Sequence, residues 1–165
     1  YQRTRVMTLF DPQSDPLGAG WNTIQAMTAL GSGGLFGKGY SLGTQAQLKF
    51  LPESHTDFIV AVLGEEMGFF GICMLLLLFS LILGRCIVLT LRAESHFGRL
   101  LSGSITLTFF AYVFVNLGMV SGVLPVVGVP LPLISYGGTS VVSLLVGFGL
   151  IMAMQRTNRV LSGEP

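Results

Sequence analysis

A short polar stretch directly before the most apolar part of the sequence holds the residues best suited to chemistry. It reads FLPESHTDFIVAVLGEEMG, residues 50–68, and its ionisable side chains are Glu53, His55, Asp57, Glu65 and Glu66. A carboxylate within hydrogen-bond reach of a substrate hydroxyl can take its proton as a general base. Of these acids Asp57 is the strongest candidate, because it comes first on a helix that then runs into the apolar region.

That helix is predicted from local signals. Pro52 prevents a helix from running unbroken through the stretch, and Ser54 or Thr56 can cap one that starts near Asp57. On an unbroken helix Asp57 would lead one stripe of small residues, which are Ala61, Gly64, Gly68 and Gly71. The stripe has two open interpretations: close helix packing, or a groove that brings a substrate to the acid. The helix geometry would also place Asp57 about 15 Å from the uncharged core, in water at the mouth of a cavity.

The remaining ionisable residues have structural alternatives. Glu65 and Glu66 lie at the edge of the apolar region, where acids need partners, and we expect cations from other spans to supply them. His55 and Asp57 are two residues apart, which is too little to predict a tight metal site.

Composition places these residues in a membrane protein. The 165 residues are 51% hydrophobic and 10% charged, with a mean hydropathy of +0.72, far more apolar than an ordinary soluble domain. The net charge of +1 without a run of basic residues excludes a nucleic-acid partner. Cys73 and Cys86 lie too far apart along one predicted helix to form a disulfide.

The charge pattern predicts an all-α fragment of a polytopic membrane protein. Residues 67–84 and 100–155 lack Asp, Glu, Lys and Arg, and a span needs about 20 apolar residues. We therefore expect three transmembrane helices, near 64–86, 100–121 and 136–155, in a membrane region of residues 57–165. Residues 1–56 are expected to form a large extracytoplasmic loop region with short helices.

The segment between the last two spans is a Pro/Gly-rich outer loop, residues 121–138, whose prolines forbid a regular helix. Irregular backbone at membrane depth must be covered by protein or line a cavity, so we expect this loop to dip into the outer interface. Asn116, Ser121 and Thr139 can bond across helices or line a site there, as can Ser135 and Tyr136.

Basic residues orient the spans, because short cytoplasmic loops carry an excess of Lys and Arg. Such residues follow the first predicted span and the last one: Arg85, Arg92, Arg99, Arg156 and Arg159. The C-terminus is therefore predicted to be cytoplasmic and residues 1–56 to lie outside. An odd number of spans with an outside start, without an initiator Met, leads us to expect part of a longer protein.

The outer region contains two notable segments. Residues 20–30 have helical spacing and form either a plain surface helix or one lying on the membrane with Trp21 as its anchor. The sequence GSGGLFGKG, from residue 31, fails the phosphate-loop pattern because Ser32 replaces a required Gly and Gly39 follows Lys38. It is predicted to be either a flexible loop or a loop whose amides and Lys38 meet a phosphate or sugar.

Several of these stretches together resemble the SEDS family. They are DPQSDPLGAGW, GSGGLFGKG, QAQLKFLPESHTDFIVAVLGEEMG and VNLGMVSGVLPVVGVPLPLISYGGTS, and the likeness is closer to the rod-shape-determining members than to the cell-division members. It implies the C-terminal portion of a ten-span protein of the bacterial inner membrane: the large outer loop after span seven, then spans eight to ten.

The resemblance also implies an activity. Family members are peptidoglycan glycosyltransferases that polymerise lipid II during cell elongation, release undecaprenyl pyrophosphate and work with a class B penicillin-binding protein. The expected partners are thus lipid II, undecaprenyl-linked glycan, membrane lipid and that protein. The essential acid of the family's HTDFI motif corresponds to Asp57. The candidates for substrate binding are Lys38, Lys49, His55, Ala61, Gly64, Ser135 and Tyr136.

Two points stay open at this stage. No cofactor is expected to bind tightly. Positive charge for the leaving pyrophosphate can come from several sources: Lys38, Lys49, Arg3, Arg5, other spans or a divalent cation, Mg²⁺ or Mn²⁺.

The alternatives to a polymerase are a flippase for the lipid-linked precursor and a non-catalytic scaffold for the penicillin-binding protein. A flippase needs ionisable groups along its whole path, and the last two predicted spans hold none, which favours the polymerase.

Overall fold

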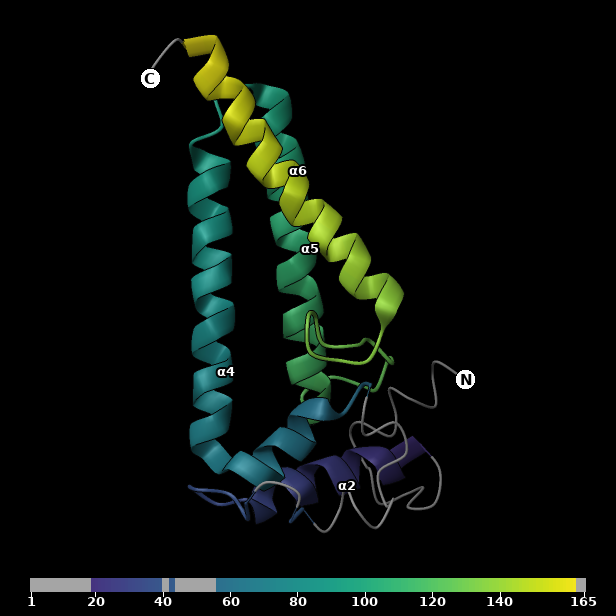
Figure 1. Ribbon diagram of the computed structural model, residues 1–165. Helices are drawn as coiled ribbons and strands as arrows, with labels where there is room; N and C mark the ends of the chain where they lie inside the picture. Colours follow the sequence, from purple (N-terminus) through teal and green to yellow (C-terminus); the bar gives the residue numbers. More distant parts are fainter. Residues whose placement is uncertain (1–18, 40–41, 44–55, 163–165) are drawn as a thin grey trace.

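The computed structural model describes residues 19–39, 42–43 and 56–162, and within these ranges the chain is helical without strands (Figure 1). The helices are α2 (Ala19–Ser32), α4 (Ile59–Leu91), α5 (His96–Val120) and α6 (Gly138–Ser162). The all-α prediction is confirmed, and α4, α5 and α6 overlie the three predicted spans. Four residues predicted to contact substrate or pyrophosphate lie outside the described residues: Lys49, His55, Arg3 and Arg5.

The helices place the functional segments at one end of the molecule. In Figure 1, α4 and α5 run antiparallel, α6 crosses them obliquely, and α2 lies across the lower end. The loop of residues 121–137, called the covering loop below, lies at that same end, whereas the connection 92–95 and the C-terminal end of α6 lie at the opposite end. The acid-bearing turn before α4 therefore lies on the side of α2 and the covering loop.

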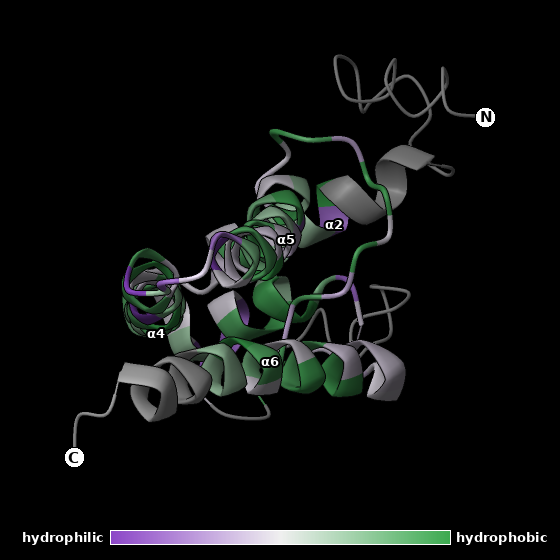
Figure 2. Ribbon diagram, turned by 90° about the horizontal axis from the view of Figure 1, so that it is seen from above, coloured by the Kyte–Doolittle hydropathy of each residue, from purple (hydrophilic) through white to green (hydrophobic). Residues whose placement is uncertain are grey.

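Length and composition make α4 and α5 candidate membrane spans. α4 and α5 are each long and apolar enough to cross a bilayer, and residues Gly138–Met154 of α6 form a shorter apolar helix. Viewed along α4 and α5, apolar residues surround much of both helices, while hydrophilic residues gather in the connection between them (Figure 2). Helices that are apolar all round suit a lipid or protein environment rather than water.

An aromatic cluster holds the three long helices together. Phe109 of α5 lies between Phe79 of α4 and Phe148 of α6, with ring centroids 5.9 and 5.4 Å apart and edge-to-face geometry. Such pairs add to the apolar burial of the rings themselves. At the end of α5 next to the connection, the Ser95 hydroxyl caps the helix by accepting from the Gly98 N–H at 3.0 Å.

The helix predicted to run unbroken from Asp57 is broken at Gly68. Gly68 has φ 67° and ψ −162°, so residues 59–67 form a short helix that meets the long part of α4 at an angle (Figure 1). This backbone conformation is essentially restricted to glycine. The prediction of one straight stripe from Asp57 to Gly71 is therefore wrong, because the two halves of the stripe lie on differently directed helices.

Candidate active site

Asp57 lies in a turn that precedes α4. Residues 56–58 form the turn, and the helix begins at Ile59 with Phe58 as its N-cap and no side-chain cap bond. The helix predicted to start near Asp57 thus begins two residues later, with Phe58 rather than Thr56 as its N-cap, and Ser54 lies outside the described residues. Asp57 thus lies outside the helix, and the position of its side chain depends on the segments that contact the turn.

Asn116 ties this turn to the covering loop. Its fully buried side chain donates from Nδ2 to the backbone oxygen of Asp57 at 3.0 Å and to that of Val129 at 2.7 Å. Both hydrogens of one amide are thereby used to join α5, the acid-bearing turn and the loop. Buried bonds of this kind are costly to break, because the carbonyl groups left behind have no water to replace the donor.

Ser135 makes a second link one residue earlier in the turn. Its buried hydroxyl donates to the backbone oxygen of Thr56 and accepts from the Leu131 N–H at 2.8 Å. The backbone oxygens of Thr56 and Asp57 are therefore both held by buried side chains, one from the covering loop and one from α5. Ser135 was predicted to contact substrate; the geometry gives it a structural role in the turn.

The covering loop also approaches the carboxylate itself. A Cβ atom at Gly128, where φ is +82°, would lie 3.3 Å from Oδ2 of Asp57, so the loop backbone passes close to the acid. Asp57 is only 9% exposed. The prediction that Asp57 stands in water at a cavity mouth is wrong, because the loop encloses it.

One polar atom beside this turn has no partner. Among the described residues, Asn116 Oδ1 is the buried side-chain oxygen without a hydrogen-bond donor. A buried acceptor left unpaired is unusual in a folded protein and destabilises it. This oxygen belongs to the same amide that holds Asp57, so the acid-bearing turn has an unused acceptor next to it.

The glycine-rich loop, residues 33–39, occupies the break in α4. The N–H groups of Lys38 and Gly39 donate to the backbone oxygens of Glu65 and Glu66, both at 3.0 Å. In return, the N–H groups of Phe69 and Phe70 donate to the backbone oxygens of Gly34 at 2.9 Å and Leu35 at 3.3 Å. In an unbroken helix these four groups would pair with one another, so the loop replaces each bond that the break removes.

Glycines permit this close approach. A Cβ atom would lie 1.9 Å from the Gly64 oxygen if placed at Gly33, 2.1 Å from the Glu66 oxygen at Gly37, and 2.3 Å from the Gly37 nitrogen at Gly68. The sequence left two alternatives open, a flexible loop or a loop whose amides and Lys38 meet a phosphate or sugar, and neither describes this segment. Its glycines and the amides of Lys38 and Gly39 serve backbone contacts with α4.

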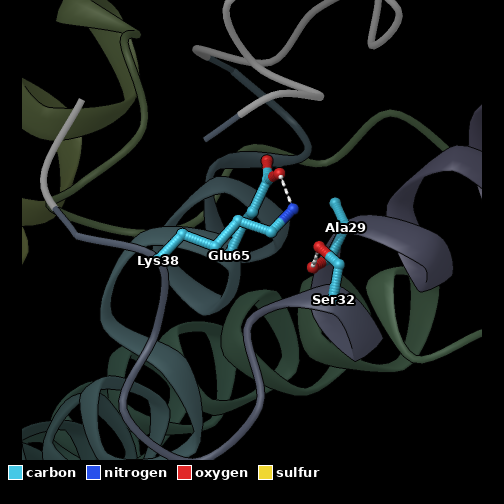
Figure 3. A network of polar contacts seen from close by, with 4 residues as sticks. All are labelled: Ala29, Ser32, Lys38 and Glu65. Atoms are coloured by element: carbon cyan, nitrogen blue, oxygen red, sulfur yellow. Dashed lines mark hydrogen bonds and ion pairs between the residues drawn. The ribbon is translucent and has the colours of Figure 1, made fainter. Parts of the chain in front are cut away.

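The side chain of Lys38 is paired with a buried acid. Its Nζ lies 2.8 Å from Oε1 of Glu65, whose side chain is fully buried (Figure 3). The figure also shows Ser32, whose hydroxyl donates to the Ala29 oxygen at 2.9 Å. Glu65 was expected to find its cation in another span, but the cation comes from the glycine-rich loop. Lys38 was predicted to bind substrate, and the structure places its charge in this ion pair.

The groove predicted above the small residues of the stripe is filled by other parts of the protein. Ala61 is fully buried, and a Cβ atom at Gly64 would lie 2.5 Å from Cδ1 of Leu30 in α2. The structure favours the packing alternative for both residues, because α2 and the glycine-rich loop occupy the groove predicted for substrate.

Tyr136 differs from its neighbour Ser135, since its side chain is 85% exposed. Nearby, α5, α6 and the covering loop enclose a groove of about 370 Å³. Residues lining the groove include Thr108, Tyr112, Pro130, Pro132, Thr139 and Ser143. Of the residues predicted around the loop, Thr139 lines this groove, whereas Asn116 and Ser135 hold the turn.

Comparison with known proteins identifies the family of the chain. The profile of the cell cycle protein family that comprises FtsW, RodA and SpoVE matches residues 1–160. The chain belongs to this family. It is 57% identical over 162 residues to the peptidoglycan glycosyltransferase MrdB of Escherichia coli, covering 98% of this chain and 44% of the relative. The resemblance to the SEDS family, inferred from the motifs, is thereby confirmed.

Two solved structures share the fold. One, which concerns the coordination of polymerization and crosslinking by a peptidoglycan synthase complex, matches with a TM-score of 0.77 and 36% identity, covering 94% of this chain and 42% of that one. A mutant of the rod-shape-determining protein RodA of Thermus thermophilus matches with a TM-score of 0.61 and 29% identity, covering 93% and 53%. The chain is thus a membrane protein segment that spans less than half the length of the MrdB relative.

Proposed function

We propose that this chain supplies the catalytic base, a carboxylate, of a peptidoglycan glycosyltransferase that polymerises lipid II during cell elongation. The observation that carries the proposal is the fixed position of Asp57, held through its own and the preceding backbone oxygen beneath the covering loop. A general base must be held within hydrogen-bond reach of the proton it takes. Membership of a family with glycosyltransferase relatives supplies the reaction class.

In the proposed reaction, the 4-hydroxyl of one lipid-linked sugar attacks the anomeric carbon of another. Asp57 takes the hydroxyl proton as the new C–O bond forms, and the bond to undecaprenyl pyrophosphate breaks. Enclosure of Asp57 by the covering loop excludes water, which strengthens its interaction with the hydroxyl. The exposed Tyr136, at the end of the same loop, remains a candidate for contact with the substrate.

The leaving pyrophosphate needs positive charge. Because Lys38 is committed to Glu65, we assign this role to Lys49, Arg3 or Arg5, with His55 as a further substrate contact, or to other parts of the full-length protein. A divalent cation, Mg²⁺ or Mn²⁺, remains a candidate; within the described residues no group of three His, Cys, Asp or Glu side chains could hold one.

We propose that α2, the acid and the covering loop face the outside of the bacterial inner membrane. Arg92 and Arg99 flank the connection at the opposite end of the bundle, where α6 also ends. Basic residues gathered at one end favour a cytoplasmic location for that end. The class B penicillin-binding protein would then act on the glycan product at the outer face.

The test is polymerisation of labelled lipid II by the purified full-length protein with its penicillin-binding partner. Asp57→Asn keeps the shape of the side chain but removes the base, so we expect the glycan ladder to disappear while expression and folding remain normal. Glu94→Gln, which changes an exposed acid in the connection at the other end, is the matched control and should leave the ladder unchanged.

A ladder of normal intensity from Asp57→Asn would refute the assignment of the base. Transport of lipid II across vesicles without any ladder from the wild type would instead support the flippase alternative. Binding of the penicillin-binding protein without either activity would support the scaffold alternative.

A further inference from the structure

The corner where α4 breaks carries a group of exposed apolar side chains. We call it the outer corner and define it as Leu35, Phe36, Met67, Phe69 and Phe70, with exposed fractions of 68, 87, 48, 61 and 72%. Two members come from the glycine-rich loop and three from α4. The loop and helix backbones contact each other directly there, since Phe70 donates to the Leu35 oxygen, so the five side chains form one surface.

The backbone of the outer corner is rigidly held. Phe36 lies between Leu35, whose oxygen accepts from Phe70, and Gly37, whose nitrogen donates to the Gly33 oxygen at 2.8 Å. The next two amides donate to the oxygens of Glu65 and Glu66. These bonds fix the backbone on both sides of Phe36, and its ring is 87% exposed from that position.

Backbone pairing at the corner suits an apolar environment. A broken helix in water can leave its free N–H and C=O groups to the solvent, but in a bilayer each needs a protein partner. All four groups freed at Gly68 are paired with the glycine-rich loop. The one acid buried there, Glu65, is neutralised by Lys38. The corner therefore presents apolar side chains over a backbone whose four groups freed at the break are paired, and the charge on Glu65 is compensated by Lys38.

The apolar surface also continues along α4. Met74, Leu77, Leu78 and Leu81 are exposed further along the same helix. Lys38, two residues after Phe36 in the glycine-rich loop, is the charged group next to the corner. This order, from apolar span to apolar corner to charged group, matches the change from acyl chains to head groups across a leaflet.

We propose that the outer corner inserts into the bilayer, with Leu35 and Phe36 at the boundary between acyl chains and head groups of the leaflet nearest α2. The glycine-rich loop then acts as a membrane contact that fixes the depth of the short helix 59–67 and of Asp57 just before it. The inference rests on the fold and does not require the proposed glycosyltransferase activity.

The test measures the surroundings of a spin label at the corner. The full-length protein, with its native cysteines replaced, is labelled at Phe36→Cys or Leu35→Cys and reconstituted into nanodiscs of phosphatidylethanolamine and phosphatidylglycerol. Collision rates are measured with oxygen, which concentrates in lipid, and with a water-soluble nickel chelate. Glu94→Cys, exposed in the connection 92–95, is the aqueous control.

We expect the oxygen-to-nickel ratio at both corner positions to be several-fold higher than at position 94. A ratio equal to that of the control would place the corner in water and overturn the proposal. Low accessibility to both reagents would show that protein covers the corner, which would also overturn it. Both substituted side chains are exposed, so neither substitution removes core packing, and elution as a single species checks folding.

Discussion

Replacing Asn116 by Ala should separate the positioning of Asp57 from the stability of the helix bundle. The substitution removes the donor to the backbone oxygens of Asp57 and Val129. Two stranded carbonyl groups cost about 2–6 kcal/mol together, and loss of the unpaired Oδ1 returns about 1–3 kcal/mol. The expected net loss in the free energy of unfolding is therefore about 1–3 kcal/mol.

The effect on catalysis should exceed the effect on stability. Without the amide, the turn of residues 56–58 keeps the Ser135 link but loses its bond to α5. A displacement of about 1 Å in a catalytic group lowers the rate roughly 100-fold. We expect kcat for lipid II polymerisation to fall by about that factor, while KM stays near the wild-type value because Asn116 is fully buried.

Val113→Ala is the matched control. Val113 is buried on the same helix and belongs to the main apolar core, so its truncation should also cost about 1–3 kcal/mol of stability through the cavity it leaves. It touches no hydrogen bond of the turn, and kcat should remain near normal. Equal losses of kcat in both variants, or normal kcat in Asn116→Ala, would refute the positioning role.

Two further predictions concern the break in α4. Lys38→Met removes the cation that pairs with the buried Glu65 and should lower the free energy of unfolding by about 3 kcal/mol, the lower end for buried pairs because Lys38 is partly exposed. Adding Glu65→Gln should restore most of this loss, as measured by chemical unfolding. A double variant as unstable as the single one would contradict the ion-pair argument. Gly68→Ala should cost about 1–3 kcal/mol for the backbone conformation alone, and more for its contact with Gly37. Gly84→Ala, which has open space around its Cβ on the same helix, should be neutral or slightly stabilising in the same measurement. Equal free energies of unfolding for the two variants would argue against the break.

Several features of this protein follow from the sequence because they depend on local properties. Membrane insertion depends on the length and composition of each apolar segment, so the three long helices could be placed from the charge-free stretches. The covering loop followed from its prolines. Asp57 could be selected as the candidate base because it is the acid of a recognisable motif next to a span.

The tertiary structure decided how those parts meet. Gly68 fits a small-residue stripe and a helix break equally well, and only the glycine-rich loop, more than 25 residues earlier in the chain, selects the break by pairing the freed backbone groups. Asn116 could have been singled out as the amide within an apolar span, but its partners are 59 and 13 residues away. A sequence read segment by segment does not reveal such partners, because any residue can offer its backbone oxygen or N–H and the partner therefore carries no signal in the sequence. For that reason composition predicted the spans, while the enclosure of Asp57 and the pairing of Lys38 became visible only in the folded chain.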